Sequence, residues 1–442
     1  MRTYLILVIT MVSCLGAGCM IPLDGDEAAP TGAVAWETGA NPNLGSGGEG
    51  RGDFDDGTAL PSGSADDDTA LPSGSATGEP MLSTSPGSGV VGGGGGTVAP
   101  GTLTAGSFDD HLNPGAFDVF RTQSKGSAQD APDLTQRALI HVDNDLGIPV
   151  NHARVIVREG ATVFLDTMTA SDGRALFIPA LDGVSASGRY EVEVSADGVA
   201  KKATFAISDQ PWAMTIPATS SLPDKLDLAF IVDATGSMGD ELEFLKAETA
   251  DISSHIAAAY PGVDVRFGLI VYRDEGDLYI SRGYGFADLT AFKHFLDQQK
   301  ADGGGDYPEA MDVALDEATK RLPWRQGNVA RVAFLIADAP PHNDGMASTF
   351  AAMNTLRKMQ VRLYPVAASG VGDLAEYVMR LGAFMTLGRY LFLTDDSGVG
   401  SSHAEPRVPC YGVEKLEALM IRMVASELSG ALVLADPSQV LR

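Results

Sequence analysis

The stretch that decides the fold of this chain is Leu226–Met238, which reads LDLAFIVDATGSM. Its apolar run is typical of a buried strand, and the run ends on Asp233, followed at alternate positions by the hydroxyls of Thr235 and Ser237. Such oxygen ligands suit Mg²⁺, Mn²⁺ or Ca²⁺ better than zinc or copper. In an open α/β sheet, ligands bind beyond the carboxyl ends of the strands. The stretch therefore predicts a cation site at the end of a buried strand.

Two later segments offer further oxygen ligands. Residues 329–338, VARVAFLIAD, repeat the pattern of a buried strand that ends on an aspartate, Asp338. Residues 303–309, GGGDYPE, carry Asp306 and precede a predicted helix over residues 309–322, and the glycines would let the backbone pass close to an ion. Three loops above one sheet could bring these side chains together. We therefore predict as metal ligands Asp233, Thr235, Ser237, Asp306 and Asp338.

These segments resemble the metal-binding motifs of the von Willebrand factor A family. Asp233, Thr235 and Ser237 match its DxSxS metal-ion-dependent adhesion motif, with threonine in place of the first serine. Asp338 matches the aspartate that the family places at the end of its fourth strand, whereas Asp306 falls where many members carry a metal-binding threonine. The resemblance implies a bound divalent cation, with Mg²⁺ expected first and Mn²⁺ or Ca²⁺ as alternatives.

The same resemblance covers residues 226 to about 430 and implies the fold. Predicted strands and helices alternate along this part of the chain, and such alternation is typical of a parallel sheet with helices on both faces. We therefore expect residues 225–432 to form an α/β domain with a doubly wound, Rossmann-like parallel sheet. Its closing helix is predicted over residues 413–428.

Asp306 departs from the family pattern in a way that bears on function. A third carboxylate would outweigh the charge of a divalent cation and weaken the attraction of that cation for a carboxylate of a partner. A structural, permanently bound metal is therefore an alternative to the capture of acidic ligands. Asp306 could also serve only as the cap of the helix that follows it.

Short alternating runs, separated by turn residues, precede the α/β part. They are ALIHV, ARVIV, TVFLDT, ALFI, YEVEV, ATFAI and AMTI, between about residues 138 and 216. Runs of this kind at near-regular spacing predict a small all-β sandwich over residues 136–219. The segments GIPVNHARVIV and ASDGRALF resemble carboxypeptidase-regulatory-like or immunoglobulin-like modules, which implies a spacer or a binding platform.

The N-terminal part of the chain predicts export and a tether. Residues 1–19 have the layout of a secretory signal, and Cys19 after an Ala-Gly pair resembles a bacterial lipobox, which implies lipidation of Cys19. An ordinary cleaved signal and lipidation at Cys14 are the alternatives. Residues 20–110 are acidic and rich in Gly, Ser and Pro, so we predict a disordered linker. The expected location is the cell envelope, with membrane attachment through the lipid.

The net charge and the motifs limit the functions that this chain can be expected to have. The chain of 442 residues carries a formal net charge of −27, which argues against nucleic-acid partners. We expect a non-catalytic envelope lipoprotein that binds a protein or glycan partner through its metal face, and a structural module in an envelope assembly is one alternative. A haloacid-dehalogenase-like phosphotransferase is another, with Asp233 as nucleophile and Asp395 and Asp396 as magnesium ligands. No lysine accompanies the strand that ends at Asp338, which counts against this enzyme.

Overall fold

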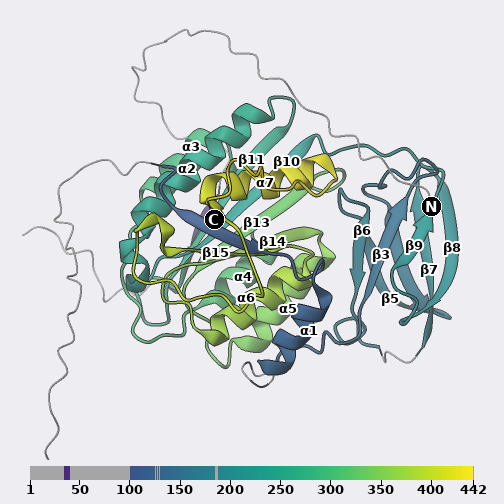
Figure 1. The fold of residues 1–442 in the computed structure, drawn as a ribbon, viewed down its shortest axis with the longest axis horizontal. Coiled ribbons are helices and arrows are strands. Elements are labelled where there is room, and N and C mark those ends of the chain that lie inside the picture. The colour runs from purple at the N-terminus through teal and green to yellow at the C-terminus, as the bar shows by residue number, and fades with distance from the viewer. Residues whose placement is uncertain are drawn as a thin grey trace, which may run out of the picture.

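The computed structural model describes residues 34–39, 100–124, 126, 128, 130–184 and 188–441. They form an α/β domain and, beside it, a smaller all-β domain (Figure 1). The predicted signal peptide over residues 1–19, its lipidation site Cys19 and most of the predicted linker lie outside the described residues. Within the described ranges, no helix is both long enough and apolar enough to cross a membrane.

A nine-stranded sheet forms the centre of the α/β domain, in the order β1-β12-β11-β10-β13-β14-β15-β2-β16. Its six middle strands are β12 (Ser281–Ala287), β11 (Asp264–Tyr272), β10 (Lys225–Asp233), β13 (Ala330–Ala337), β14 (Val361–Ala367) and β15 (Tyr390–Leu393). All of these strands run parallel except β12, which is antiparallel to β11. The chain extends the sheet from β10 first to one side and then to the other, so the predicted doubly wound sheet is confirmed.

Helices cover both faces of this sheet because side chains alternate along the buried strands. Leu228, Phe230 and Val232 of β10 pack in one hydrophobic core, whereas Ala229 and Ile231 pack in the other. The helices over the first core are α2 (Leu242–Ala259), α3 (Leu289–Asp297) and α7 (Leu416–Ser429). Those over the second are α4 (Met311–Lys320), α5 (Met346–Lys358) and α6 (Asp373–Met385), as Figure 1 shows.

Two strands of the sheet, β1 at one edge and β2 between β15 and β16, come from the segment that we predicted to be a disordered linker. β1 (Ala35–Thr38) pairs with β12, and β2 (Thr104–Phe108) pairs with β15 and with β16 (Val413–Lys415). The prediction is therefore wrong for β1 and β2, which belong to the folded α/β domain. The predicted closing helix over residues 413–428 is also corrected at its start, because its first residues form β16.

β1 is held at the sheet edge by an aromatic side chain. Trp36 lies opposite Gly283 of β12, and its indole nitrogen donates a hydrogen bond of 2.6 Å to Glu317. A β-carbon on Gly283 would overlap the Trp36 ring, so this glycine makes the room that the ring occupies. The hydroxyls of Thr38 and Ser281 also donate to the buried Glu317 carboxylate. One acidic side chain of α4 thus fixes both the edge strand and its neighbour.

Gly283→Ala is expected to displace β1, because the added methyl group overlaps the indole of Trp36. Gly285→Ala is the matched control, since a β-carbon there meets its nearest atom, the carbonyl oxygen of Val34, at an ordinary 3.5 Å. The other two tryptophans, Trp212 and Trp324, are buried, so a red shift of the emission reports exposure of Trp36. Equal emission from the two variants would contradict this role of Gly283.

The smaller domain is a β-sandwich inserted between helix α1 (Pro114–Gln123) and β10. A three-stranded sheet, β6-β3-β9, faces a four-stranded sheet, β5-β4-β7-β8, and one hydrophobic core lies between them. The strands are β3 (Ala138–Asp143), β4 (Arg154–Glu159), β5 (Thr162–Met168), β6 (Arg174–Phe177), β7 (Arg189–Ala196), β8 (Val199–Ala206) and β9 (Trp212–Thr215). Each alternating run of the sequence corresponds to one of them.

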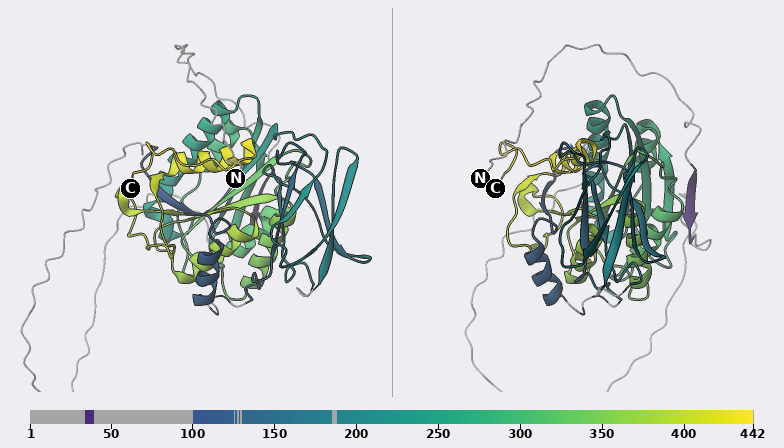
Figure 2. Two further views of the ribbon diagram at one scale, coloured as in Figure 1. Left: turned by 45° about the vertical axis from the view of Figure 1, so that its right-hand side comes forward. Right: turned by 90° about the vertical axis from the view of Figure 1, so that its right-hand side faces the viewer.

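The sandwich docks at the amino ends of the parallel strands (Figures 1 and 2). Arg362, near the start of β14, donates to both carboxylate oxygens of Asp172 at 2.9 Å and to Glu427 of α7 at 3.2 Å. Arg357 of α5 donates to Asp182 at 2.5 Å. Buried ion pairs thus connect the two domains. The carboxyl ends of the strands, where the cation site is predicted, lie at the opposite edge of the sheet.

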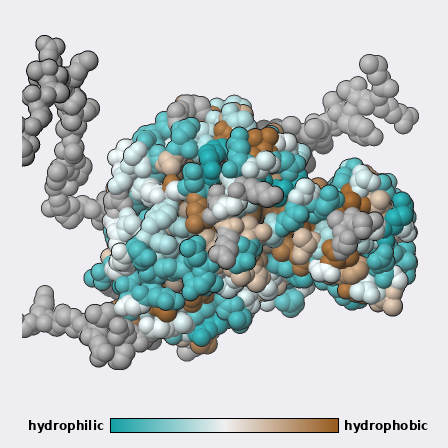
Figure 3. All heavy atoms as spheres, turned by 90° about the horizontal axis from the view of Figure 1, so that it is seen from below, coloured by the Kyte–Doolittle hydropathy of each residue, from teal (hydrophilic) through white to brown (hydrophobic). Residues whose placement is uncertain are grey.

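Hydrophobic side chains also gather where the two domains meet, as the view from below shows (Figure 3). A pocket of about 530 Å³ is lined there by Leu139 and Leu176 of the sandwich and by Phe384 of α6. Arg137 lies 4.9 Å from the Phe384 ring centroid and covers part of this surface. Polar and apolar contacts therefore both hold the sandwich against the α/β domain.

Candidate metal centre

Asp233 and Asp338 end neighbouring parallel strands. Val232 of β10 pairs with Ile336 of β13, so the two aspartates reach the same edge of the sheet. Their exposed fractions are 0% and 3%. Burial, and then the negative charge of Asp338, raise the pKa of Asp233 to about 7. A proton or a cation that offsets part of their charge would stabilise two buried carboxylates that repel each other in this way.

The turn after β10 lines up three oxygen-bearing side chains. Oδ1 of Asp233 accepts hydrogen bonds from the backbone amide of Thr235 at 2.9 Å and from its hydroxyl at 2.6 Å. The Thr235 hydroxyl lies 3.2 Å from Oγ of Ser237. Oδ2 of Asp233 is buried without a hydrogen bond of ordinary geometry, although Tyr272 lies close enough to lower the Asp233 pKa. Thr235 is buried and Ser237 exposed, so the oxygens run from the interior to the surface.

The GGGDYPE loop closes on this turn through a glycine. Gly304 has a φ of +72°, and a β-carbon on it would lie 2.8 Å from Oε1 of Glu309 and 3.2 Å from Cβ of Thr235. The carbonyl oxygen of Gly303 accepts from the backbone amide of Gly236 at 3.0 Å. A residue without a side chain is therefore needed where the loop passes between Thr235 and Glu309.

Glu309 is the functional candidate that the sequence analysis missed. It is 3% exposed, and its Oε2 is buried without a hydrogen-bond partner. Burial, followed by the charges of Asp233, Asp274 and Asp338, raises the Glu309 pKa to about 9. The predicted helix begins at Glu309, but α4 begins at Met311, which leaves the glutamate in the loop beside the two strand ends. Its one signal in the sequence is an acidic residue at the end of the glycine-rich segment.

The structure places Asp306 in a second group of side chains. Asp306 is exposed, and one oxygen each from Asp306 and Asp274 and one ring nitrogen of His342 lie within 4.8 Å of one another. Nε2 of His342 lies 2.6 Å from Oδ1 of Asp274. The negative charge of Asp233 contributes to the raised pKa of Glu309. The loop thus offers two candidate ligands, and only Glu309 is buried.

The residues at this edge fit a divalent cation. Asp233, Asp338 and Glu309 are buried carboxylates, and the first two raise the pKa of Glu309, an effect that a bound cation would relieve. Oδ2 of Asp233 and Oε2 of Glu309 are buried oxygens with lone pairs to offer. Together with the hydroxyls of Thr235 and Ser237 they form an oxygen-only set, which hard divalent cations prefer. The arrangement thus offers oxygen ligands for a cation at this edge of the sheet.

The pH dependence of stability is expected to reveal these carboxyls. Unfolded carboxyls have pKa values of about 4, so Asp233 and Glu309 together hold more protons in the metal-free folded protein than in the unfolded chain between about pH 4 and pH 9. The contribution of these two carboxyls to stability should therefore fall as the pH rises through this range. Melting temperatures in a chelator test this, and the gain on adding Mg²⁺ should be larger at the alkaline end. A gain independent of pH would contradict the expectation.

The phosphotransferase hypothesis requires Asp395 and Asp396 beside Asp233. They follow β15 in the short helix η2 (Asp395–Ser397), and three strand spacings, roughly 14 Å, separate β15 from β10. Oδ1 of Asp395 lies 2.8 Å from Nδ1 of His403, whose Nε2 lies 2.8 Å from Glu241. The assignment of these two aspartates as magnesium ligands beside Asp233 is therefore wrong.

Comparison with known proteins identifies the part of the chain that carries this site. Residues 227–373 match the family model of the von Willebrand factor A domain, and this range includes the five predicted ligands and Glu309. This part of the chain is thus similar to the von Willebrand factor A domain, in line with the resemblance seen in its sequence. Such a domain supports a role as a protein-interaction module.

Three individual proteins are similar to parts of the chain. It is 36% identical over 120 residues to "Alpha-protein kinase vwkA" of Dictyostelium discoideum, covering 26% of this chain and 19% of the relative. It is 36% identical over 126 residues to "Putative ariadne-like RING finger protein R811" of Acanthamoeba polyphaga mimivirus, covering 28% and 12%. The chain spans less than a fifth of either relative. The crystal structure of the conserved hypothetical protein BatB from Bacteroides thetaiotaomicron matches with 15% identity and a TM-score of 0.32, over 46% of this chain and 98% of that one.

Proposed function

We propose that this chain is a non-catalytic cell-envelope lipoprotein whose von Willebrand factor A domain binds a protein or glycan partner through a divalent cation. The observation that carries the proposal is the set of three buried carboxylates, Asp233, Asp338 and Glu309, beside the hydroxyls of Thr235 and Ser237. The sandwich docks at the other end of the strands and does not cover this edge. This supports a metal face that a partner can reach.

The hydroxyl and carboxylate oxygens would coordinate the cation in different ways. Thr235 and Ser237 would coordinate the cation through their hydroxyls, and Asp233 and Asp338 would coordinate it directly or through water. Mg²⁺ is the expected ion, with Mn²⁺ and Ca²⁺ as alternatives. Ser237 is exposed, which supports an ion accessible to an oxygen of the partner.

The fifth position would come from the GGGDYPE loop, either from Asp306, as the sequence predicts, or from Glu309. Glu309→Gln is expected to weaken Mg²⁺ binding by about 10- to 100-fold, and Asp306→Asn by less than about threefold. Both changes replace a carboxylate with an amide of the same shape, so each variant is the control for the other. Titration calorimetry on the full chain measures both affinities. The opposite order would place Asp306 in the site and Glu309 outside it.

The same pair of variants separates adhesion from a structural role. Chemical crosslinking at the cell envelope should capture a partner with the wild-type chain and with Asp306→Asn, and should lose it with Glu309→Gln or a chelator. Crosslinks that survive the loss of the cation would favour the alternative, a structural module of an envelope assembly. In that case the domain would still bind a cation, but the cation would not be needed to capture the partner.

Envelope attachment is carried by the N-terminal sequence, with Cys19 as the lipidated residue. Cys19→Ser should remove incorporated fatty acid and move the protein from the membrane fraction to the soluble one. A lipid label that persists in this variant would place the anchor elsewhere, and Cys14 would be the first position to examine. A wild-type chain without label would support an ordinary secreted protein.

A further inference from the structure

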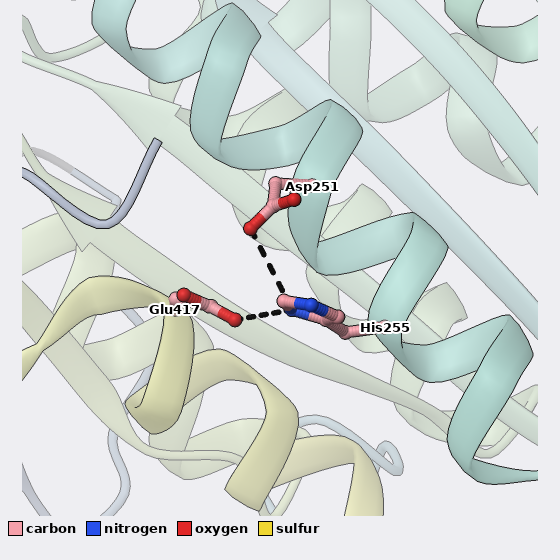
Figure 4. Close-up of side chains that lie close together, drawn as sticks. All are labelled: Asp251, His255 and Glu417. Atoms are coloured by element: carbon pink, nitrogen blue, oxygen red, sulfur yellow. Dashed lines mark ion pairs between the residues drawn. The ribbon is translucent and has the colours of Figure 1, made fainter. Parts of the chain in front are cut away.

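A second group of metal-ligating side chains lies between α2 and α7, away from the strand ends. Asp251 and His255 are one turn apart on α2, and Glu417 lies in the first turn of α7. Figure 4 shows the three side chains pointing toward one another from the two helices. Because packed helices carry all three residues, the spacing of their ligand atoms is set by helix packing and not by a loop.

The ligand atoms are close enough to share one ion. Nδ1 of His255 lies 3.5 Å from Oδ2 of Asp251 and contacts Oε1 of Glu417. One ligand atom from each residue lies within 4.8 Å of the other two. The two carboxylates are partly buried, whereas the His255 side chain is 53% exposed, so an ion could enter from solvent.

A third carboxylate adds negative charge to this region. Glu248, one turn before Asp251 on α2, is 1% exposed, and its Oε1 accepts from the backbone amides of Thr102 and Leu103 at 2.7 and 2.9 Å. Its Oε2 is buried without a hydrogen-bond partner. Burial raises the pKa of Glu248, and the charge of Glu417 adds to this effect. Glu248 therefore lies close enough to Glu417 for their charges to interact.

We propose that Asp251, His255 and Glu417 bind a transition-metal ion of the zinc class and so link α2 to α7. One imidazole nitrogen with two carboxylates is a ligand set that zinc accepts, and it differs from the oxygen-only set at the strand ends. Three protein ligands leave a fourth position for water. The competing account is an ion-pair triad in which a protonated His255 balances the two carboxylates without any metal.

The position of this site gives the ion a structural consequence. α2 follows the turn that carries Asp233, Thr235 and Ser237. α7 ends near Glu427, which accepts from Arg362 at the junction with the sandwich. An ion between the helices would therefore connect α2, which follows the site at the strand ends, to α7, which contacts the sandwich. Zinc would therefore stabilise the folded chain by mass action.

Zinc titration of the full chain tests the proposal. Calorimetry is carried out near neutral pH with millimolar Mg²⁺ present to fill the oxygen site. His255→Ala is expected to weaken zinc binding by about 100-fold, since loss of a direct ligand costs at least as much as loss of its supporting partner. The matched control is His294→Ala, which removes an exposed histidine of α3 whose neighbour one turn later is Gln298. This control should bind zinc as the wild type does.

Glu417→Gln provides a second variant, on the other helix and with unchanged shape. It should also weaken zinc binding and abolish the zinc-dependent rise in melting temperature. Cys410 is an exposed free cysteine that can bind zinc by itself, so only the differences among these variants count. Equal zinc binding by wild type, His255→Ala and Glu417→Gln would overturn the proposal in favour of the ion-pair triad. So would a wild-type chain that binds no zinc at neutral pH.

Discussion

Asp233→Asn should lower the Mg²⁺ affinity of the chain by about 100-fold or more, because it removes the charge of a fully buried carboxylate of the site. The amide keeps the shape of the carboxylate, and its oxygen can still accept from the backbone amide of Thr235. The metal-free fold should lose little stability, since the substitution also removes the repulsion between Asp233 and Asp338. Titration calorimetry and thermal melts with and without Mg²⁺ measure the two effects.

Asp302→Asn is the matched control for this variant. It makes the same chemical change in the loop next to the site, but the Asp302 side chain is 80% exposed. Its Mg²⁺ affinity should stay within about threefold of the wild-type value, because an exposed charge is screened by water and salt. Equal loss of affinity in both variants would mean that the general negative charge of the surface, and not the buried aspartate, attracts the ion.

Arg362→Met should destabilise the folded chain by about 3 kcal/mol or more, because it leaves buried partners without their counter-charge. Arg362 is 2% exposed and joins Asp172 of the sandwich to Glu427 of α7. Burial alone would raise the Asp172 pKa, but Arg362 and Arg174 lower it, so the ion pair dominates. Urea unfolding of the full chain measures the loss, and the two domains should then unfold less cooperatively.

Lys358→Met is the control for the interface variant. Lys358 lies at the same junction, with its Nζ 3.4 Å from Asp182, but its side chain is 42% exposed. A partly solvated ion pair contributes less than about 1 kcal/mol, so this change should be nearly neutral. If Lys358→Met cost as much as Arg362→Met, burial would not be what gives the Arg362 network its strength.

Much of the fold could be predicted because its strands are short and apolar, and because the pattern that marks each strand lies within the residues of that strand. The apolar runs that end at Asp233 and Asp338 form β10 and β13, and the sandwich strands follow their alternating patterns. β1 could not be found in this way. Its four residues, AWET, have no periodicity, and they are held by distant partners, Gly283 and Glu317. Pairing between residues so far apart leaves no local trace in a low-complexity segment.

In the candidate site, too, some residues could be predicted from local sequence and another could not. Asp233 and Asp338 end long buried runs, so their meeting at one sheet edge follows from parallel pairing alone. Glu309 depends on the path of a loop with a left-handed glycine at position 304, which turns the glutamate back toward Thr235. Sequence spacing does not determine such a path, so the sequence pattern favours Asp306 of the same loop. The charge environment of Glu309 becomes visible only in three dimensions.

Anomalous scattering from crystals soaked in Mn²⁺ tests the central claim most directly. The structure predicts one strong peak at the carboxyl edge of the sheet, within bonding distance of the Thr235 and Ser237 hydroxyls and flanked by Asp233 and Asp338. Glu309, rather than Asp306, should face the ion from the glycine-rich loop. The account would be contradicted by crystals with no peak at this edge, or with manganese only beside Asp274 and His342.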